Sequence, residues 1–259
     1  MRLDARAALQ CHEFLHKSFA PGCFDLSERA PESEMMRELK RQGDIHEART
    51  IENLMTKNLD ILVINKDQGE IEKELTTAEA LINSTAQIII GAWISSVCEE
   101  KIAELTGRET ASDPDRVSRP DLLIRVGEGA DGKPRWAPVD IKSHDPINEN
   151  KSSKLYLAQW DSFLPSDGIE TVARLDLEDA AQLAHYHEHL RTLGLATNEG
   201  FIGVIGRDIE TIVWAKLAET ALGLGGKDGN ASTDYLIRFE AAKQVVTNSI
   251  ARQKDSSLP

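Results

Sequence analysis

The sequence has few cysteines and no long apolar run. Its three cysteines, Cys11, Cys23 and Cys98, are an odd number at unrelated spacings, so they complete neither a disulfide framework nor a four-cysteine zinc or iron–sulfur site. The longest apolar stretch, residues 88–97, contains a glycine and two serines and is about half of the roughly 20 residues that a membrane-spanning helix needs. The N-terminal residues 1–14 lack the continuous apolar core of a signal peptide. We therefore expect a cytoplasmic protein without a membrane span.

Net positive charge is also lacking. The 259 residues include 30 Lys and Arg against 43 Asp and Glu, which gives a formal net charge of −13 at pH 7. A protein with this charge repels polyanions over most of its surface, so it can bind nucleic acid only through a local basic patch or a bound cation. The segment 116–160 is the candidate for such a patch, because its eight basic and six acidic residues give +2 against −15 for the remainder.

Hydrophobic periodicity predicts an alternation of helices and strands. We expect helices at 3–15, 35–41, 45–55, 70–83, 178–193 and 235–253, and strands at 60–66, 86–95, 122–126, 136–142, 201–205 and 211–217. Gly43 is expected to interrupt the second helical region, the polar stretch 145–167 shows no clear pattern, and the glycine-rich 223–229 is expected to be a flexible turn. The order predicts an α/β fold with a mixed central β-sheet flanked by helices, in a single domain 1–259 with its core at about 40–217.

Asp140 and Lys142 carry the clearest chemical signal. Ionisable and apolar residues alternate in 139–142, so on a strand Asp140 and Lys142 project from one face. The turn-rich segment 127–132 predicts a hairpin that brings Asp121, at the start of the preceding strand, near Asp140. Two carboxylates at close range repel one another unless a cation lies between them, and hard oxygen ligands favour Mg²⁺ or Mn²⁺.

These residues resemble the signature of the PD-(D/E)xK nuclease superfamily, and in particular of its RecB-like members. Pro120-Asp121 and Asp140-Ile141-Lys142 match the core of that signature. Gly43-Asp44-Ile45-His46 is similar to the upstream Gly-x-x-His helix motif, and the segment 182–186 is similar to the downstream Gln-x-x-x-Tyr helix motif. The resemblance covers about residues 3–217 and implies a restriction-endonuclease-like core.

The resemblance implies a metal site. By it, His46, Asp121, Asp140 and the backbone carbonyl of Ile141 would bind Mg²⁺ or Mn²⁺. Glu47, the next residue along the chain, is an alternative to His46 as the ligand.

The resemblance also implies catalytic and substrate-binding residues. Asp121, Asp140 and Lys142 would be catalytic, with Lys142 orienting the attacking water or stabilising the transition state. Gln182 and Tyr186, one turn apart on a helix, would hold the metal site and the substrate phosphates in place. The implied reaction is the hydrolysis of phosphodiester bonds, with DNA, single- or double-stranded, as the substrate.

Two features that occur in relatives of this kind are missing from the sequence. No cysteine follows Cys98, so the iron–sulfur cluster that some RecB-like nucleases carry is not expected. The chain has no Gly-x-x-x-x-Gly-Lys-Ser/Thr phosphate loop, so a helicase or another targeting partner would have to supply unwinding.

Other interpretations remain open at this stage. The net charge of −13 is compatible with a catalytically inactive scaffold that binds nucleic acid or protein. His185, His187 and His189 raise the possibility of a zinc hydrolase, although Glu188 does not have the spacing of a zincin. Asp140 and Lys142 could be a surface ion pair, and Gln182 and Tyr186 the polar rim of a helix. Cys11 is expected in the core, on the apolar stripe of the first helix.

Overall fold

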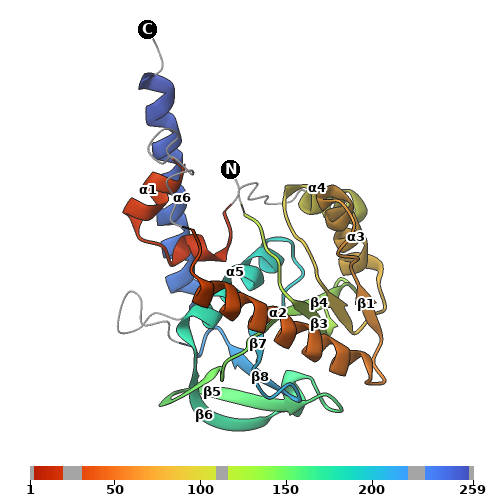
Figure 1. Cartoon of the computed structure of the whole chain (residues 1–259). Coiled ribbons are helices and arrows are strands. Elements are labelled where there is room, and N and C mark those ends of the chain that lie inside the picture. The colour runs from red at the N-terminus through yellow and green to blue at the C-terminus, as the bar shows by residue number, and fades with distance from the viewer. Residues whose placement is uncertain (1–2, 20–30, 109–115, 221–230, 257–259) are drawn as a thin grey trace.

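An eight-stranded mixed β-sheet forms the centre of the molecule. The computed structural model describes residues 3–19, 31–108, 116–220 and 231–256, and within them the strand order is β1-β2-β3-β4-β7-β8-β5-β6. The strands are β1 (Ile61–Val63), β2 (Ile88–Ile90), β3 (Leu122–Glu128), β4 (Pro134–Ile141), β5 (Ile147–Gln159), β6 (Ile169–Leu175), β7 (Phe201–Ile205) and β8 (Thr211–Lys216). Helices flank the sheet (Figure 1), which confirms the expected α/β class. The expected glycine-rich turn at 223–229 lies outside the described residues.

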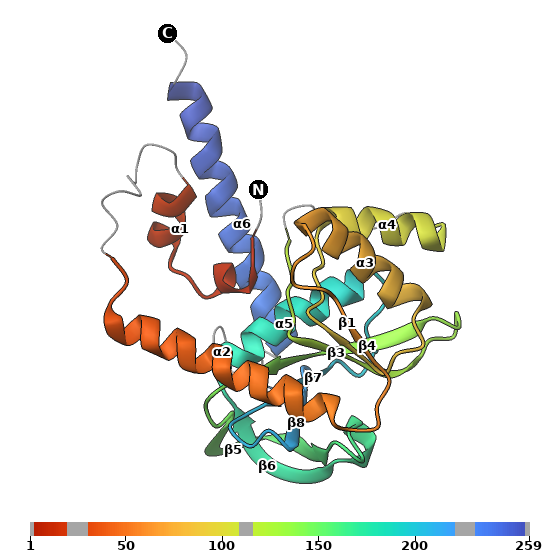
Figure 2. The same cartoon turned by 45° about the vertical axis from the view of Figure 1, so that its right-hand side comes forward.

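Helices cover both faces of the sheet (Figures 1 and 2). They are η1 (Ala5–Ala8), α1 (His12–Phe19), α2 (Glu34–Met55), α3 (Glu70–Asn83), α4 (Ser96–Thr106), η3 (Pro165–Asp167), α5 (Leu177–Thr192) and α6 (Ala231–Ser256). On one face Leu54 of α2 packs in a cluster with Ile88, Leu122 and Val139. On the other face Ile89 packs with α3 and α4. Successive strand residues therefore belong to opposite faces, as the pleat of a strand requires.

The N-terminal elements and the last helix pack together beside α5. In Figure 2 α1 lies alongside α6, and α6 also contacts η1 and α5. Tyr235 and Phe239 anchor α6 in a cluster with the apolar residues of α5. None of the described helices is both long and apolar enough to cross a membrane.

Both expected hairpins are confirmed. β3 and β4 pair antiparallel with Leu122 opposite Val139, and β7 and β8 pair antiparallel with Val204 opposite Val213. β4 also pairs in parallel with β7, so the two hairpins are joined at the middle of the sheet. The expected helix at 178–193 is confirmed as α5, whose N-cap Asp176 accepts hydrogen bonds from the backbone N–H groups of Glu178 and Asp179.

The expected interruption at Gly43 is wrong, because α2 runs unbroken from Glu34 to Met55. A helical glycine costs only about 1 kcal/mol relative to alanine. The side chains of Thr50 and Leu54 are fully buried at the C-terminal end of α2. Ser33 caps the N-terminal end by accepting a hydrogen bond from the Met36 N–H at 3.2 Å. These interactions outweigh the small cost of having one glycine inside the helix.

Two other segments also differ from expectation. The polar stretch 145–167 contains β5, a 13-residue strand that pairs with β6 and β8. The expected helix at 3–15 is a short 3-10 turn, η1, followed by the separate helix α1. The break leaves Cys11 exposed, so its expected place in the core is wrong.

Candidate metal-binding site

The β3–β4 hairpin brings Asp121 and Asp140 together. The pairing of Leu122 with Val139 places Asp121, one residue before β3, opposite Asp140. Asp121 Oδ2 accepts a hydrogen bond from the backbone N–H of Ile141 at 2.7 Å. This contact fixes one carboxylate of the pair against the backbone of the strand that carries the other.

The alternation along β4 is the one the sequence predicts. Val139 and Ile141 belong to the apolar cluster that packs under α2. Lys142 lies on the side of α5, where its Nζ donates a hydrogen bond to Gln182 Oε1 at 2.9 Å. The Lys142 Nζ also lies 3.1 Å from Asp140 Oδ2. The interpretation of Asp140 and Lys142 as a surface ion pair is therefore wrong, because Asp140 is only 1% exposed.

Asp140 is the least satisfied polar group of the site. Both oxygens of its carboxylate are buried and accept no hydrogen bond among the described residues. The ammonium of Lys142 lies 3.1 Å from Oδ2. A carboxylate buried this deeply is costly to ionise unless cations and hydrogen bonds offset its charge, and a bound metal ion is one such cation.

The pKa values of the two carboxyl groups also indicate that it is costly to ionise both of them. Burial, followed by the charge of Asp140, raises the pKa of Asp121 to about 8. Burial raises the pKa of Asp140 despite the opposing effect of Lys142. The charge of Glu47 also acts to raise the pKa of both groups. The two acids cannot both be ionised cheaply at neutral pH without a metal or another cation.

Lys142 stays a cation. Burial acts to lower its pKa, but the charges of Asp140 and Asp179 outweigh burial and raise it. Its Nζ lies 3.7 Å from Asp179 Oδ1 as well as against Asp140 and Gln182. The ammonium is thus held by three side chains from two elements.

Helix α5 supplies the other wall of the site. Asp179, Gln182 and Tyr186 lie at helical spacings of three and four residues, so they share one face. Gln182 Nε2 donates a hydrogen bond to Tyr186 Oη at 2.7 Å. Burial, followed by the charge of Asp140, raises the pKa of Tyr186. The structure therefore brings Gln182 and Tyr186 next to Lys142 and Asp140.

His46 and Glu47 are placed differently with respect to the pair. His46 Nε2 hydrogen-bonds with the backbone carbonyl of Gly206 at 3.1 Å. Glu47, in contrast, lines a pocket of about 160 Å³ that it shares with Asp121. Glu47 also forms an ion pair with Lys66 at 3.2 Å. Of the two candidate ligands left open by the sequence, the geometry favours Glu47.

The donor set fits a hard divalent cation. Asp121 and Asp140 provide carboxylate oxygens, and the N–H of Ile141 faces Asp121. Because N–H and C=O of one strand residue point to the same edge, the Ile141 carbonyl lies on that edge too. The described residues contain no group of three His, Cys, Asp or Glu side chains placed to hold a metal. Mg²⁺ needs only one or two carboxylates, because it keeps several water ligands.

Comparison with known proteins identifies no relative of this chain. No family model, no curated protein and no solved structure matches the chain.

The three histidines of α5 do not form a zinc site in the described structure. His185 bonds the hydroxyl of Tyr235 and the backbone carbonyl of Val117. His189 bonds Ser118 at 2.9 Å and Glu99 at 2.7 Å. All three rings, including His187, are buried within the fold. His185 and His189 thus link α5 to its neighbours.

Asp179 and His144 belong to the site but were not predicted. Asp179 is buried, and its Oδ2 lies 2.9 Å from His144 Nε2. The available signal was the spacing of Asp179 three residues before Gln182, on the same helical face. That spacing acquires meaning only once Lys142 is known to lie against this face of α5.

Proposed function

We propose that the protein is a divalent-metal-dependent nuclease with a restriction-endonuclease-like core, which hydrolyses phosphodiester bonds in DNA. The observation that carries the proposal is the buried carboxylate of Asp140. Neither of its oxygens accepts a hydrogen bond among the described residues, although Asp121 and Lys142 lie beside it. Two acids and an amine in this arrangement match the chemistry of the PD-(D/E)xK signature.

The chain's own residues have distinct tasks in this proposal. Asp121 and Asp140, with the Ile141 carbonyl, would hold Mg²⁺ or Mn²⁺, which when bound lowers the pKa of a water and offsets charge on the scissile phosphate. Lys142 places a positive charge beside the reacting phosphate, where negative charge increases in the transition state. Asp179 and Gln182 keep the Lys142 ammonium in position through their contacts with Nζ.

Cationic side chains near the acids support a polyanionic substrate. Lys66, Lys73 and Arg119 line the pocket that contains Glu47 and Asp121. Phosphate groups bind Lys and Arg side chains, and this contact is independent of base sequence. The local charge therefore favours nucleic acid at this point, against the acidic charge of the whole chain.

The first test is cleavage of labelled DNA. Single- and double-stranded DNA are incubated with the protein and Mg²⁺ or Mn²⁺, and with the variants Asp140→Asn and Lys142→Ala. We expect each substitution to reduce the rate by at least about 100-fold, because each removes a group that acts on the transition state. Lys40→Ala is the matched control, since Lys40 is an exposed lysine of α2 that pairs with Glu32 and lies outside the segment 116–160.

The outcomes separate a nuclease from an inactive scaffold. Equal cleavage by the wild type and by Lys142→Ala contradicts the proposal, because the activity would then come from elsewhere. Absence of cleavage of DNA and RNA with every metal also contradicts it and favours the scaffold. Calorimetric titration with Mn²⁺ shows in either case whether Asp140→Asn removes metal binding.

A further inference from the structure

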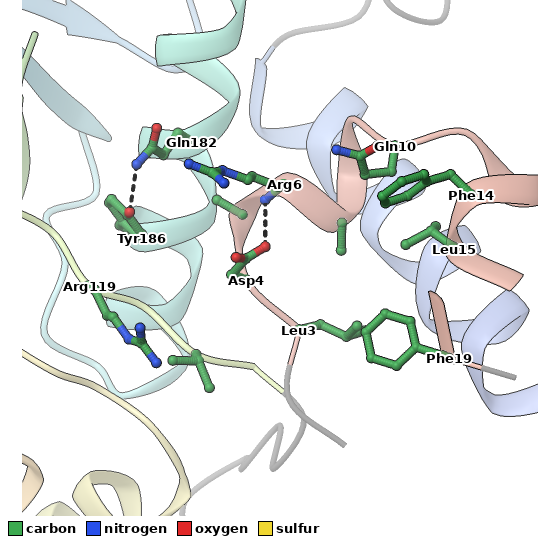
Figure 3. A pocket seen from close by; sticks show the side chains of 13 residues that line it. Leu3, Asp4, Arg6, Gln10, Phe14, Leu15, Phe19, Arg119, Gln182 and Tyr186 are labelled. Atoms are coloured by element: carbon green, nitrogen blue, oxygen red, sulfur yellow. Dashed lines mark hydrogen bonds between the residues drawn. The ribbon is translucent and has the colours of Figure 1, made fainter. Parts of the chain in front are cut away.

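A cavity of about 650 Å³ lies between the N-terminal elements and α5 (Figure 3). Arg6, Gln10 and Phe14 line it on the N-terminal side, and Gln182, Tyr186 and Arg119 line it on the side of the proposed active site. The N-terminal side comes from residues outside the core expected at about 40–217. The cavity is therefore an addition that this chain makes to its central fold.

The cavity shares residues with the proposed active site. Gln182 and Tyr186 line it, and Gln182 Oε1 also accepts the hydrogen bond of the Lys142 Nζ. Arg119 lines both this cavity and the smaller pocket that contains Asp121. Arg119 is thus placed to contact a ligand in either pocket.

The cavity carries cationic groups suited to phosphate. Arg6 is exposed, and Figure 3 shows its side chain pointing from η1 toward Gln182. The guanidinium of Arg119 lies 3.7 Å from the centre of the Trp93 ring, which leaves its edge available for hydrogen bonds. Asp4 also lines the cavity, and its carboxylate accepts a hydrogen bond from the Arg6 backbone N–H at 3.0 Å. The cavity is thus basic by one charge, in a chain whose net charge is −13.

The lining of the cavity also includes an exposed aromatic ring. Phe14 is 49% exposed although it belongs to an amphipathic helix, and its ring lines the cavity. Aromatic rings with a free face bind nucleobases by stacking, which tolerates any base. Two arginines for phosphates and a ring for a base are the elements of a site for single-stranded nucleic acid.

We propose that this cavity binds a single-stranded segment of the substrate, with a base against Phe14 and phosphates at Arg6 and Arg119. The assignment rests on the proposed function for the identity of the ligand, but its test does not require cleavage. A single strand is favoured over a duplex, because stacking on the Phe14 ring requires an unpaired base whose face is accessible.

Fluorescence anisotropy measures the binding directly. The probes are a fluorescein-labelled oligothymidylate of about eight nucleotides, within the usual site size for single strands, and a duplex of the same length. The full chain carries Lys142→Ala and is assayed with Mn²⁺, and a denaturing gel checks that the probe remains intact. Phe14→Ala is expected to weaken binding of the single strand about tenfold, and Phe14→Trp to restore it. Ile169→Ala is the matched control, since Ile169 is an exposed apolar residue on β6.

Salt dependence tests the phosphate contact. Loss of one contact with a single strand reduces the slope of log affinity against log salt by about 0.7. We expect this reduction for Arg6→Gln and not for Arg41→Gln, because Arg41 is paired with Glu38 on the exposed part of α2.

The outcomes distinguish this inference from the proposed function. Affinity unchanged by both Phe14→Ala and Arg6→Gln overturns the inference, even if the wild type cleaves DNA. If the substitutions weaken binding of the duplex and binding of the single strand to the same extent, the assignment of a single-stranded ligand is overturned. If both variants weaken single-strand binding but the wild type cleaves no substrate, the cavity assignment stands and the nuclease assignment falls.

Discussion

Asp121 and Asp140 show how a single residue pair can reduce the stability of a fold while creating a site. Burial and the charge of Asp140 raise the pKa of Asp121 to about 8, and burial raises that of Asp140. A carboxyl group whose pKa is higher in the folded than in the unfolded state binds extra protons when folded. Its effect on stability is therefore most favourable at low pH and declines as pH rises from about 4 to about 8.

The variant Asp121→Asn tests this pH dependence of stability. The amide oxygen can still accept the hydrogen bond of the Ile141 N–H, while the charge beside Asp140 is removed. Without metal, we expect the variant to be more stable than the wild type at pH 8 by about 1 kcal/mol or more, and the difference to shrink toward pH 5. Urea denaturation in EDTA at pH 5 and at pH 8 measures the difference in the free energy of unfolding between the two proteins.

Metal addition supplies the control for that prediction. Mn²⁺ should raise the Tm of the wild type, because a ligand of the folded state stabilises it, and should raise that of Asp121→Asn much less. A metal-free variant that is less stable than the wild type at pH 8 would show that Asp121 has a purely structural role.

At the scale of elements, the sequence predicts what local periodicity determines. The hairpins β3–β4 and β7–β8 combine apolar strands with turn residues, and both form as expected. The residues on β4 were therefore placed correctly, since the alternation of Asp140 and Lys142 with Val139 follows from strand geometry alone.

Elements whose form depends on distant partners were not predictable in this way. β5 is polar over much of its length and becomes a strand because β6 and β8 pair with it on both sides. Asp179 becomes part of the site because α5 packs on the face of the sheet that carries Lys142. Such contacts leave little trace in the local sequence.

Helix α2 offers a test of its continuity. Gly43 lies within the helix, and a Cβ built on it meets no atom within 4 Å. Gly43→Ala should therefore stabilise the protein by about 0.5–1 kcal/mol and raise Tm by about 2 °C. Thermal unfolding measures the shift. An unchanged or lower Tm would indicate that the helix is interrupted at Gly43, as the sequence alone suggested.

Helix α5 offers a test of how Lys142 is positioned. Asp179→Asn removes a charge 3.7 Å from the Lys142 Nζ and preserves the size of the side chain. If the protein cleaves DNA, we expect kcat to fall by about tenfold with little change in KM, because a displaced ammonium affects the transition state more than substrate binding. Steady-state kinetics checks this, with the exposed Asp161→Asn as control. An unchanged kcat would mean that Asp140 and Gln182 suffice to position Lys142.

At the scale of the whole molecule, α5 joins segments that are distant in the sequence. His185 links it to Val117 and to Tyr235 of α6, and His189 links it to Ser118 and to Glu99 of α4. The same helix carries Gln182 and Tyr186 into the site. Because both sets of contacts belong to one rigid helix, the contacts of His185 and His189 help to determine where the helix presents the face that carries Gln182 and Tyr186.

His185 makes this connection sensitive to acid. Burial, opposed by the bond to Val117 and reinforced by the charges of Arg116 and His189, lowers the pKa of His185 well below its ordinary value of 6.5. The unfolded chain then binds the proton more readily, so the stability that His185 contributes is present above pH 6.5 and is lost as pH falls below it.

His185→Gln keeps hydrogen-bonding groups but cannot take up the proton. We expect the advantage of the wild type over His185→Gln to shrink as pH is lowered from 7.5 to 5, by at most about 1.4 kcal/mol for each pH unit below 6.5. Urea denaturation of both proteins in EDTA measures the difference, in which the opposite effect of Asp121 cancels. Parallel stability curves across this range would show that His185 is protonated equally in the folded and unfolded states.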